Sequence, residues 1–418
     1  MNIIDLFAGA GGLSEGFRKA GFNIVAHVEM DKSACNTLRT REAYYYLKSS
    51  NKFKLYLDYL EKKISREQLY EQVPSRVLNN VIESEISNKT FSSITSIIDE
   101  RLKSSPNNHI DIIIGGPPCQ AYSYVGISRD PNRMKDDPRN YLYRHYIRFL
   151  KKYKPKFFIF ENVKGILTAK NGTIFKSLQK SVLRAGYKID YKVLNSKDFG
   201  VSQNRERVIL IGWKNIYQFK FPEFNIVPEP VNIKQLFNDL PPLNAGESID
   251  GLKKYRKRAK IANSFIRPQE WNILSQHITR SNNEKDLLIY KLVVDTWNKE
   301  KRLLKYNELP NELQSHKNKE SFLDRFKLVR LEDISHTVVA HISKDGHYYI
   351  HPDVNQNRSI SVREAARIQS FPDDFYFEDS RTAAFKQIGN AVPPLMAYHI
   401  ALILQEYLNQ TNKKSIIS

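Results

Sequence analysis

Apolar runs alternate with helical patterns along the first half of the chain. Five runs rich in isoleucine, valine and phenylalanine, which favour strands, occur at residues 2–7, 22–29, 110–116, 156–163 and 207–213. Each run is continuously apolar, as expected for parallel strands covered by helices on both faces. A helical pattern separates the first two runs and ends at Gly21. This alternation predicts an α/β fold with a doubly wound, Rossmann-like sheet.

The pattern changes in two regions outside these runs. Residues 41–108 are rich in Lys, Glu, Leu, Tyr and Ser with helical spacing, which predicts helices inserted into the core. After Trp213, closely spaced prolines interrupt regular elements, so we place a domain boundary after residue 214. The unit that follows is polar and lacks strand–helix alternation, although residues 336–353, with a turn at Asp345 and Gly346, predict a β-hairpin.

Composition adds a strong positive charge to this picture. The 418 residues include 65 Lys and Arg against 45 Asp and Glu, a net charge of +20. This charge favours a polyanionic partner such as nucleic acid; the alternative is a basic surface that only maintains solubility. No apolar run approaches the roughly 18 residues of a membrane span, and Met1 leads into a strand without a signal-peptide pattern. We therefore expect a cytoplasmic protein that does not cross a membrane.

The chain has only two cysteines, Cys35 and Cys119. They are too few for a disulfide framework and are not clustered with other metal ligands, so we expect reduced thiols and no metal. Cys119 stands in DIIIGGPPCQAYS (111–123), directly after a predicted strand, where α/β sheets place their sites. The two prolines stiffen this loop and make Cys119 a candidate reactive thiol. Cys35, within a helical pattern, is interpreted as a buried structural residue.

A glycine motif, DLFAGAGG (5–12), follows the first predicted strand. Its backbone N–H groups and the following helix could cradle a nucleotide-like ligand. A dinucleotide fingerprint would need a third glycine where Ser14 stands. Phe7 could lie against an adenine, and Glu29 is placed to accept hydrogen bonds from ribose hydroxyls. The motif therefore predicts an adenosine ligand without a pyrophosphate; the alternative is a turn that only lets helix and sheet pack closely.

Three charged residues near strand ends could complete a reactive site. Arg205 and Arg207 alternate, so they should point to the same side of a strand, and positive charge activates a thiol. Glu161 lies in the run 156–163, where desolvation helps a carboxyl to keep a proton. A thiolate, a protonatable carboxyl and an adenosine cofactor suit methylation of cytosine carbon 5, which is unreactive until a nucleophile adds at carbon 6.

Six motifs span both ends of the chain in the order of a known family. They are DLFAGAGG (5–12), GGPPCQAYS (115–123), ENVKG (161–165), QNRERV (203–208), REAARIQSFPDDF (363–375) and QIGNAVPP (387–394). Together they resemble the DNA (cytosine-5)-methyltransferases of bacterial restriction-modification systems. The resemblance implies that Cys119 is the nucleophile, that Glu161 contacts N3 of the cytosine and Arg207 its O2, and that Arg205 stabilises the site nearby.

The resemblance also implies an S-adenosylmethionine-dependent methyltransferase core. The implied cofactor contacts are Phe7, Ala8, Gly9, Gly11, Gly12, Glu29, Met30, Pro117, Leu142, Asn390 and Val392. Glu85, in VIESEIS (81–87), is the nearest likeness to the acid that meets the adenine amino group in this family. The implied DNA contacts are Gln120, Ser123 and Gln203. We expect the motif at 363–375 to have a mainly structural role.

The same resemblance divides the chain into three segments. Residues 1–214 are expected to form the catalytic domain, 215–380 the smaller target-recognition domain, and 381–418 a return to the catalytic domain. Double-stranded DNA is expected between the domains, with the target cytosine flipped out of the helix. We further expect a monomer, and a cognate restriction endonuclease that acts on the same site and from which methylation protects the host DNA.

Two alternatives to a DNA methyltransferase follow from the same residues. A tRNA cytosine methyltransferase shares these motifs, but that branch usually carries a Cys-Phe-Thr signature, and this chain has no cysteine beyond Cys119. A catalytically inactive DNA-binding protein is disfavoured because Cys119, Glu161 and both arginines are present.

Overall fold

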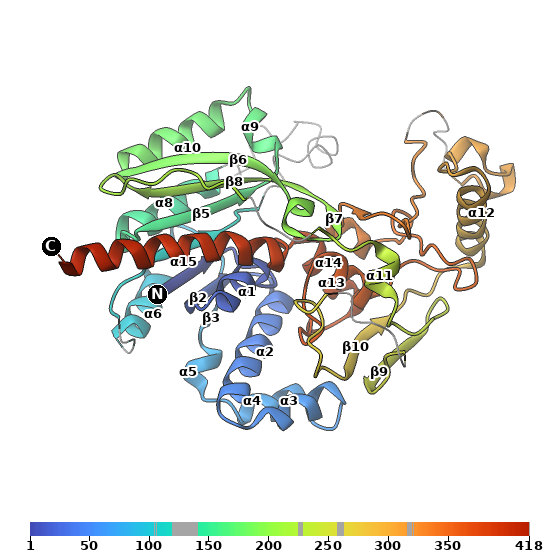
Figure 1. Cartoon of the computed structure of the whole chain (residues 1–418), viewed down its shortest axis with the longest axis horizontal. Coiled ribbons are helices and arrows are strands. Elements are labelled where there is room, and N and C mark those ends of the chain that lie inside the picture. The colour runs from blue at the N-terminus through green and yellow to red at the C-terminus, as the bar shows by residue number, and fades with distance from the viewer. Residues whose placement is uncertain are drawn as a thin grey trace.

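A seven-stranded sheet is formed by strands from residues 2–214 (Figure 1). The computed structural model describes residues 1–103, 105, 107–118, 141–224, 229–256, 263–315, 320 and 322–417. The strands are Asn2–Leu6 (β1), Asn23–Glu29 (β2), Val81–Glu83 (β3), Ile112–Gly115 (β4), Phe157–Asn162 (β5), Tyr187–Asn195 (β6) and Glu206–Lys214 (β8). Their order is β3-β2-β1-β4-β5-β8-β6, with β8 antiparallel to both of its neighbours. This order confirms the doubly wound, Rossmann-like fold.

Helices cover both faces of this sheet. They are Gly12–Lys19 (α1), Phe91–Lys103 (α6), Leu142–Tyr153 (α8), Thr173–Arg184 (α10) and Pro394–Ile417 (α15). Ile3 and Ile112 face α1 and α15, whereas Ile4 and Ile113 face α6, α8 and α10. Successive residues of a strand point to opposite faces, which explains why each run is apolar throughout. Among the described residues, no helix is long and apolar enough to span a membrane.

Helices α1 and α15, which cover the same face of the sheet, pack closely against each other. A Cβ atom at Gly16 would lie 2.5 Å from Ala397 Cβ, the Pro394 carbonyl oxygen and the Tyr398 nitrogen. Protein interiors do not accommodate such an approach without a shift of the backbone. Glycine at position 16 therefore allows the C-terminal helix to lie against the N-terminal one.

The segment 41–108 is only partly the helical insertion that its composition predicts. Helix α2 (Lys32–Ser49) leads into α3 (Phe53–Leu60), α4 (Arg66–Glu71) and α5 (Ser75–Leu78). The chain then returns to the sheet, because β3 pairs in parallel with β2 and α6 covers one sheet face. The prediction missed β3 because three residues are too few to show a periodicity. The added helices are thus α3 to α5.

The second unit contains little regular structure (Figure 1). Its helices are Ile233–Phe237 (α11), Glu284–Glu300 (α12) and Val362–Ile368 (α13), followed by Arg381–Asn390 (α14), and its short strands are Ser248–Leu252 (β9) and Ile273–Ile278 (β10). β9 and β10 form an antiparallel pair of their own. One hydrophobic cluster joins residues of α11, β10, α13 and α14 with residues of α2, α3 and α4. The second unit and the added helices therefore share a core.

The predicted hairpin at residues 336–353 is wrong. Ser335–His336 (β11) pairs in parallel with Gln203–Asn204 (β7), and residues 340–343 form a 3₁₀ turn. Tyr349 explains the difference, because its hydroxyl group donates to the Thr337 carbonyl at 3.0 Å and accepts from the Val339 N–H at 3.0 Å. A side chain therefore satisfies the backbone groups that a hairpin ladder would have paired.

Substitution of Gly16 should destabilise the protein through the helix contact described above. Gly16→Val places a branched side chain between α1 and α15, and overpacking of this kind costs about 1–3 kcal/mol. Urea denaturation should show this loss in the free energy of unfolding. Lys176→Ala on the exposed face of α10 is the control and should change stability by less than about 0.5 kcal/mol. Equal stability of the Gly16 variant and wild type would contradict the tight packing.

Candidate active site

The predicted site residues gather where strands of the sheet end. β1 and β4 are neighbours from which the strand order runs in opposite directions. Such a switch point leaves a crevice beyond the carboxyl ends of the strands, where doubly wound folds bind ligands. The glycine motif follows β1, Glu29 ends β2, Pro117 follows β4 and Glu161 lies near the end of β5. The topology therefore brings four separate motifs to one edge.

The glycine loop after β1 has an unusual backbone. Phe7, Gly9 and Gly11 have φ angles of 57°, 54° and 81°, and a positive φ is strained for phenylalanine. A Cβ atom at Gly11 would lie 2.7 Å from Leu38, whereas no atom lies within 4 Å of the Cβ position of Gly9. The loop is thus packed on one side and open at Gly9. Strain of this kind concentrates at ligand sites.

Glu29 lies beside the open part of the glycine loop. Its Oε2 accepts from the Gly9 N–H at 2.7 Å, and its Oε1 accepts from the N–H groups of Met30 and Asp31 at 2.8 Å each. Burial nevertheless raises the pKa of Glu29, because desolvation outweighs these three bonds. A carboxylate offers about four acceptor positions, so about one remains, on Oε2, for a ligand hydroxyl.

The remaining predicted cofactor residues lie around this loop in different environments. Met30 is 63% exposed, and Glu85 is an exposed residue just after β3, next to the end of β2. Ala8 donates its N–H to the Val28 carbonyl at 3.2 Å. Leu142 begins α8 and is half-buried. The structure therefore places all four at or near the carboxyl edge of the sheet.

The C-terminal motif reaches the glycine loop directly. The Val392 carbonyl oxygen touches the position that a Cβ atom of Gly12 would occupy, and Ala391 lies beside it. Asn390 is exposed at the end of α14, whereas Val392 is buried. Only glycine at position 12 permits this approach. The first and the last motifs of the chain are therefore parts of one site.

Glu161 and Arg207 form an ion pair at the same edge. Arg207 Nε lies 2.9 Å from Glu161 Oε1, and both side chains are 13% exposed. A Cβ atom at Gly116 would lie 2.6 Å from Glu161 Oε2, so the carboxylate lies against the loop that carries the two prolines. Asn162 fixes this loop by donating to the Pro117 carbonyl at 3.2 Å. The pair is near enough to solvent to meet a substrate.

Comparisons with known proteins agree with this arrangement. A family model described as C-5 cytosine-specific DNA methylase matches residues 1–55 and 78–406. The chain belongs to this family. It is 41% identical to the type II methyltransferase M.Bpa9945I of Bacillus paralicheniformis, with 98% of this chain and 99% of that protein covered. It is 30% identical to M1.HphI of Haemophilus parahaemolyticus, with 96% and 86% covered.

A solved structure supports the fold independently. A DNA modification methyltransferase encoded within an E. coli prophage has a TM-score of 0.64 with this chain at 24% sequence identity, over 98% of this chain and 99% of that one. At that identity the likeness concerns the fold alone. The family and its type II relatives identify the protein as a DNA cytosine-5-methyltransferase.

Arg205 of the methyltransferase does not join Arg207 and Glu161. Its guanidinium group is buried and donates to the carbonyls of Val338 at 2.7 Å, Gly389 at 3.2 Å and Ala391 at 3.0 Å. The expectation that the two arginines point into one pocket is therefore wrong, because Arg205 lies between the short β7 and β8, where strict alternation is interrupted. Arg205 instead positions the C-terminal motif.

Gln203 is also part of the internal framework. It is completely buried; its amide nitrogen donates to Gln369, and its amide oxygen accepts from the Val338 N–H at 2.8 Å. Both ends of the amide are thus used within the protein, which does not support the predicted DNA contact. The sequence offers no signal for this burial, since Gln203 stands in a polar run.

The two cysteines fall in different parts of the description. Cys119, with the predicted DNA contacts Gln120 and Ser123, lies outside the described residues. Cys35 is buried in α2, and burial together with Glu29 and Glu83 raises the pKa of its thiol to about 12. A thiol that stays protonated is a poor nucleophile. The interpretation of Cys35 as a structural residue is therefore confirmed.

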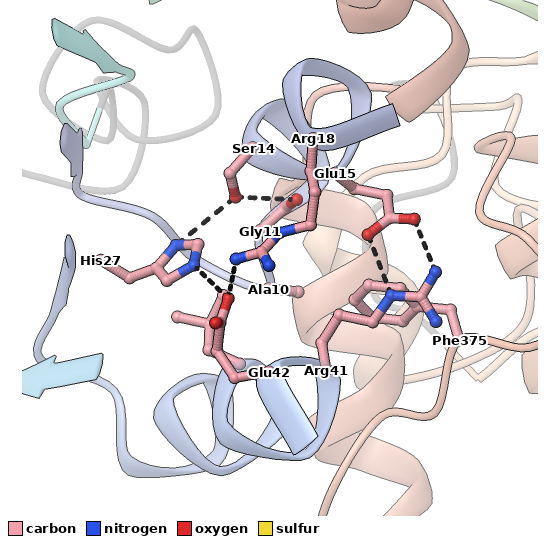
Figure 2. A pocket seen from close by; sticks show the side chains of 10 residues that line it. Ala10, Gly11, Ser14, Glu15, Arg18, His27, Arg41, Glu42 and Phe375 are labelled. Carbon is pink, nitrogen blue, oxygen red and sulfur yellow. Dashed lines mark hydrogen bonds and ion pairs between the residues drawn. The ribbon is translucent and has the colours of Figure 1, made fainter. Parts of the chain in front are cut away.

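A cluster of buried charged side chains lies beneath the glycine loop (Figure 2). The sequence patterns do not predict this cluster. His27 lies 3.5 Å from Asp5 and 3.2 Å from Glu42, which also pairs with Arg18. Burial opposes the charged form of His27, but the neighbouring carboxylates of Asp5 and Glu42 raise its pKa. The adjoining cavity, lined also by Gly11, has a volume of about 10 Å³, room for one water molecule at most. The cluster therefore supports the loop without offering a ligand site.

Arg205 and Arg207 should respond differently to substitution. Arg205→Ala removes the donor of the buried Val338 and Gly389 carbonyl oxygens, whereas the Ala391 carbonyl keeps a donor in Gln369. Each unsatisfied group costs about 1–3 kcal/mol, so the free energy of unfolding should fall by several kcal/mol. Arg207→Ala should lower the free energy of unfolding by less, because the Arg207 side chain is partly exposed and water can take the place of its guanidinium group. Chemical denaturation of both variants measures the difference. Equal losses of stability would contradict the positioning role of Arg205.

Proposed function

We propose that this methyltransferase transfers a methyl group from S-adenosylmethionine to carbon 5 of a cytosine in double-stranded DNA through a covalent adduct at Cys119. The observation that carries the proposal is the Glu161–Arg207 pair, which lies against Gly116, three residues before Cys119 in the sequence. The loop that leads to the proposed nucleophile, a carboxyl group and a cation thus lie at the edge of the sheet that also carries the glycine loop. No metal is required by this chemistry.

The glycine loop fits S-adenosylmethionine in shape and chemistry. Open space at Gly9 and the remaining acceptor position on Glu29 suit an adenosine ribose, and Phe7 borders the loop. Because Ser14 replaces a third glycine, the loop lacks the fingerprint of a pyrophosphate site. When bound, S-adenosylmethionine supplies an electrophilic methyl group. Gly12, Asn390 and Val392 would complete the cofactor site, with Glu85 near the adenine.

The side chains of this site divide the reaction among them. The Cys119 thiolate adds to carbon 6 of the cytosine, and Glu161 holds a proton at N3, so that electron density moves to carbon 5. Arg207 keeps the Glu161 carboxyl group oriented and donates to O2 of the base. After carbon 5 has accepted the methyl group, its proton passes to solvent water, and the C–H electron pair restores the double bond between carbons 5 and 6. The bond between carbon 6 and the sulfur then breaks and releases the Cys119 thiolate. The enzyme is then regenerated.

The DNA is proposed to lie between the sheet edge and the second unit. A stacked cytosine is out of reach of a side chain, so the base must be flipped out of the duplex. Residues 215–380 would recognise the sequence, while Gln120 and Ser123 would contact DNA near the target. The high net positive charge supports binding to phosphates. We further propose a monomer that protects host DNA from a cognate restriction endonuclease, as its type II relatives suggest.

Cys119→Ser should reduce methyl transfer about a thousandfold or more, as loss of a nucleophile typically does. The assay is transfer of a labelled methyl group to duplex DNA, with the site mapped by bisulfite sequencing. Duplex DNA that carries 5-fluorocytosine should form a covalent complex with the wild type, because fluorine cannot leave as a proton does. Cys35→Ser serves as the control and should remain active. Retained activity of the Cys119 variant would refute the mechanism.

The affinity for S-adenosylmethionine should fall as the pH decreases through the raised pKa of Glu29. The ribose needs the ionised carboxylate as acceptor, and burial makes this group take up its proton above the ordinary value of 4.5. Glu29→Gln should weaken binding about 10- to 100-fold, the worth of a hydrogen bond to a charged group, and remove this pH dependence. Calorimetric titrations at several pH values measure both effects. An unchanged pH profile in the variant would contradict the assignment.

A further inference from the structure

The helices α3, α4 and α5 are an addition to the methyltransferase core, yet they are well buried. The family model leaves residues 56–77 unmatched, so the shared chemistry of the family does not need them. Nevertheless Tyr56, Leu60, Leu69 and Val73 are each at most 5% exposed, within the core that includes α11, β10 and α13. A surface insertion with no structural role would not share a hydrophobic core with the second unit.

Helices α3 and α4, together with α2, form a polar socket for one buried acid of the second unit. Glu378 is 3% exposed, and its carboxylate accepts from the Tyr59 hydroxyl at 2.7 Å and from the hydroxyl of Thr40. Arg66 lies 3.4 Å from the same carboxylate and 2.9 Å from Asp379. The socket thus takes one group from each of α2, α3 and α4. Burial raises the pKa of Glu378, as expected where desolvation is only partly offset.

On its other side, the turn that carries Glu378 is bound by β10 and α13, two further elements of the second unit. Gln276 of β10 exchanges two hydrogen bonds with the Phe377 backbone, at 2.7 and 2.9 Å. Arg363 of α13 donates to the Phe375 carbonyl at 2.9 Å. The turn 371–379 is therefore clamped between the proposed recognition unit and the added helices.

The same turn also contacts the helix that follows the glycine loop. Arg41 of α2 pairs with Asp374 at 3.0 Å and forms two hydrogen bonds with Glu15 of α1, at 2.6 and 2.9 Å (Figure 2 shows the Arg41–Glu15 pair). Although burial favours the neutral acid, Arg41 lowers the pKa of Glu15 to about 2. Tyr56 adds a bond to the Asp374 carbonyl at 2.7 Å. Buried charges that are paired in this way favour one orientation, since any other leaves them unpaired.

We propose that residues 53–78 are a brace that fixes the recognition unit against the cofactor domain, with Tyr59 and Arg66 as positioning residues for DNA. The brace fixes the orientation of the second unit, whose side chains would read the DNA sequence, relative to the edge of the sheet at which the flipped cytosine would react. Its contacts with the second unit are made on the turn 371–379, on Trp271 and on Asp250. The inference rests on the proposed position of the DNA.

The test compares DNA and cofactor parameters of a double variant, Tyr59→Phe with Arg66→Ala. The KM for a duplex that contains the mapped site should rise about three- to tenfold, the usual size of coupling through such contacts. The preference for this duplex over one with a single mismatched base pair should fall by a similar factor. The Kd for S-adenosylmethionine should stay within about twofold of wild type. Arg66→Lys, which keeps the charge, should restore part of the DNA affinity.

Glu71→Gln is the matched control, because Glu71 lies at the end of the same helix α4 and its side chain is exposed. This variant should behave as wild type in every assay. If the double variant does not fold, Tyr59→Phe alone, which removes one hydroxyl group, is held to the same criteria. An unchanged KM and preference for DNA, or a parallel loss of cofactor affinity, would overturn the brace. Direct measurement of DNA affinity by anisotropy keeps this result separate from a failure of the Cys119 chemistry.

Discussion

The contact between the two ends of the chain is the constraint on which the rest of this methyltransferase depends. Gly12 and Gly16 leave no space for a side chain where α1 meets the Val392 carbonyl and the start of α15. This contact covers one face of the sheet and completes the cofactor loop with the last motif. The chain between β8 and α14 must therefore leave the sheet and return to it. The second unit consists of this intervening stretch of chain. Because the chain returns to the sheet at α14 and α15, the second unit lies beside the carboxyl edge of the sheet.

Buried arginines hold the two parts together. Arg205 binds three carbonyls of the returning chain, and Arg41 joins α1 to the turn 371–379. Within the second unit, Arg367 of α13 is paired with Asp239 and Asp373 and fixes the position of the turn 371–379. Ion pairs of this kind add little net stability compared with apolar packing, but they strongly disfavour orientations in which a charge is left alone. The framework therefore fixes a defined geometry between the glycine loop, the carboxyl edge of the sheet and the second unit.

The chemistry of the edge follows from the same geometry. A parallel sheet brings the ends of distant strands together, so Glu29, Glu161 and the two prolines before Cys119 need no sequence proximity to share a site. Arg207 reaches Glu161 from the antiparallel β8, which begins at this edge because it runs opposite to β5. The one reversed strand thus brings an arginine to an edge where its parallel neighbours bring a carboxylate and a loop.

The sequence alone determined the doubly wound fold, the glycine loop after the first strand, the position of Glu161 near a strand end and the burial of Cys35 in a helix. Each of these features follows from local periodicity or from the place of a residue at the end of a strand. Only the tertiary structure decided that Arg205 and Gln203 are internal, that β3 belongs to the sheet and that the added helices share a core with the second unit. These features depend on contacts between residues more than 50 positions apart, such as His27 with Val81, Arg205 with Val338 or Tyr59 with Glu378. Local patterns cannot encode such pairings, because a polar residue in a loop looks the same whether water or a distant carbonyl satisfies it.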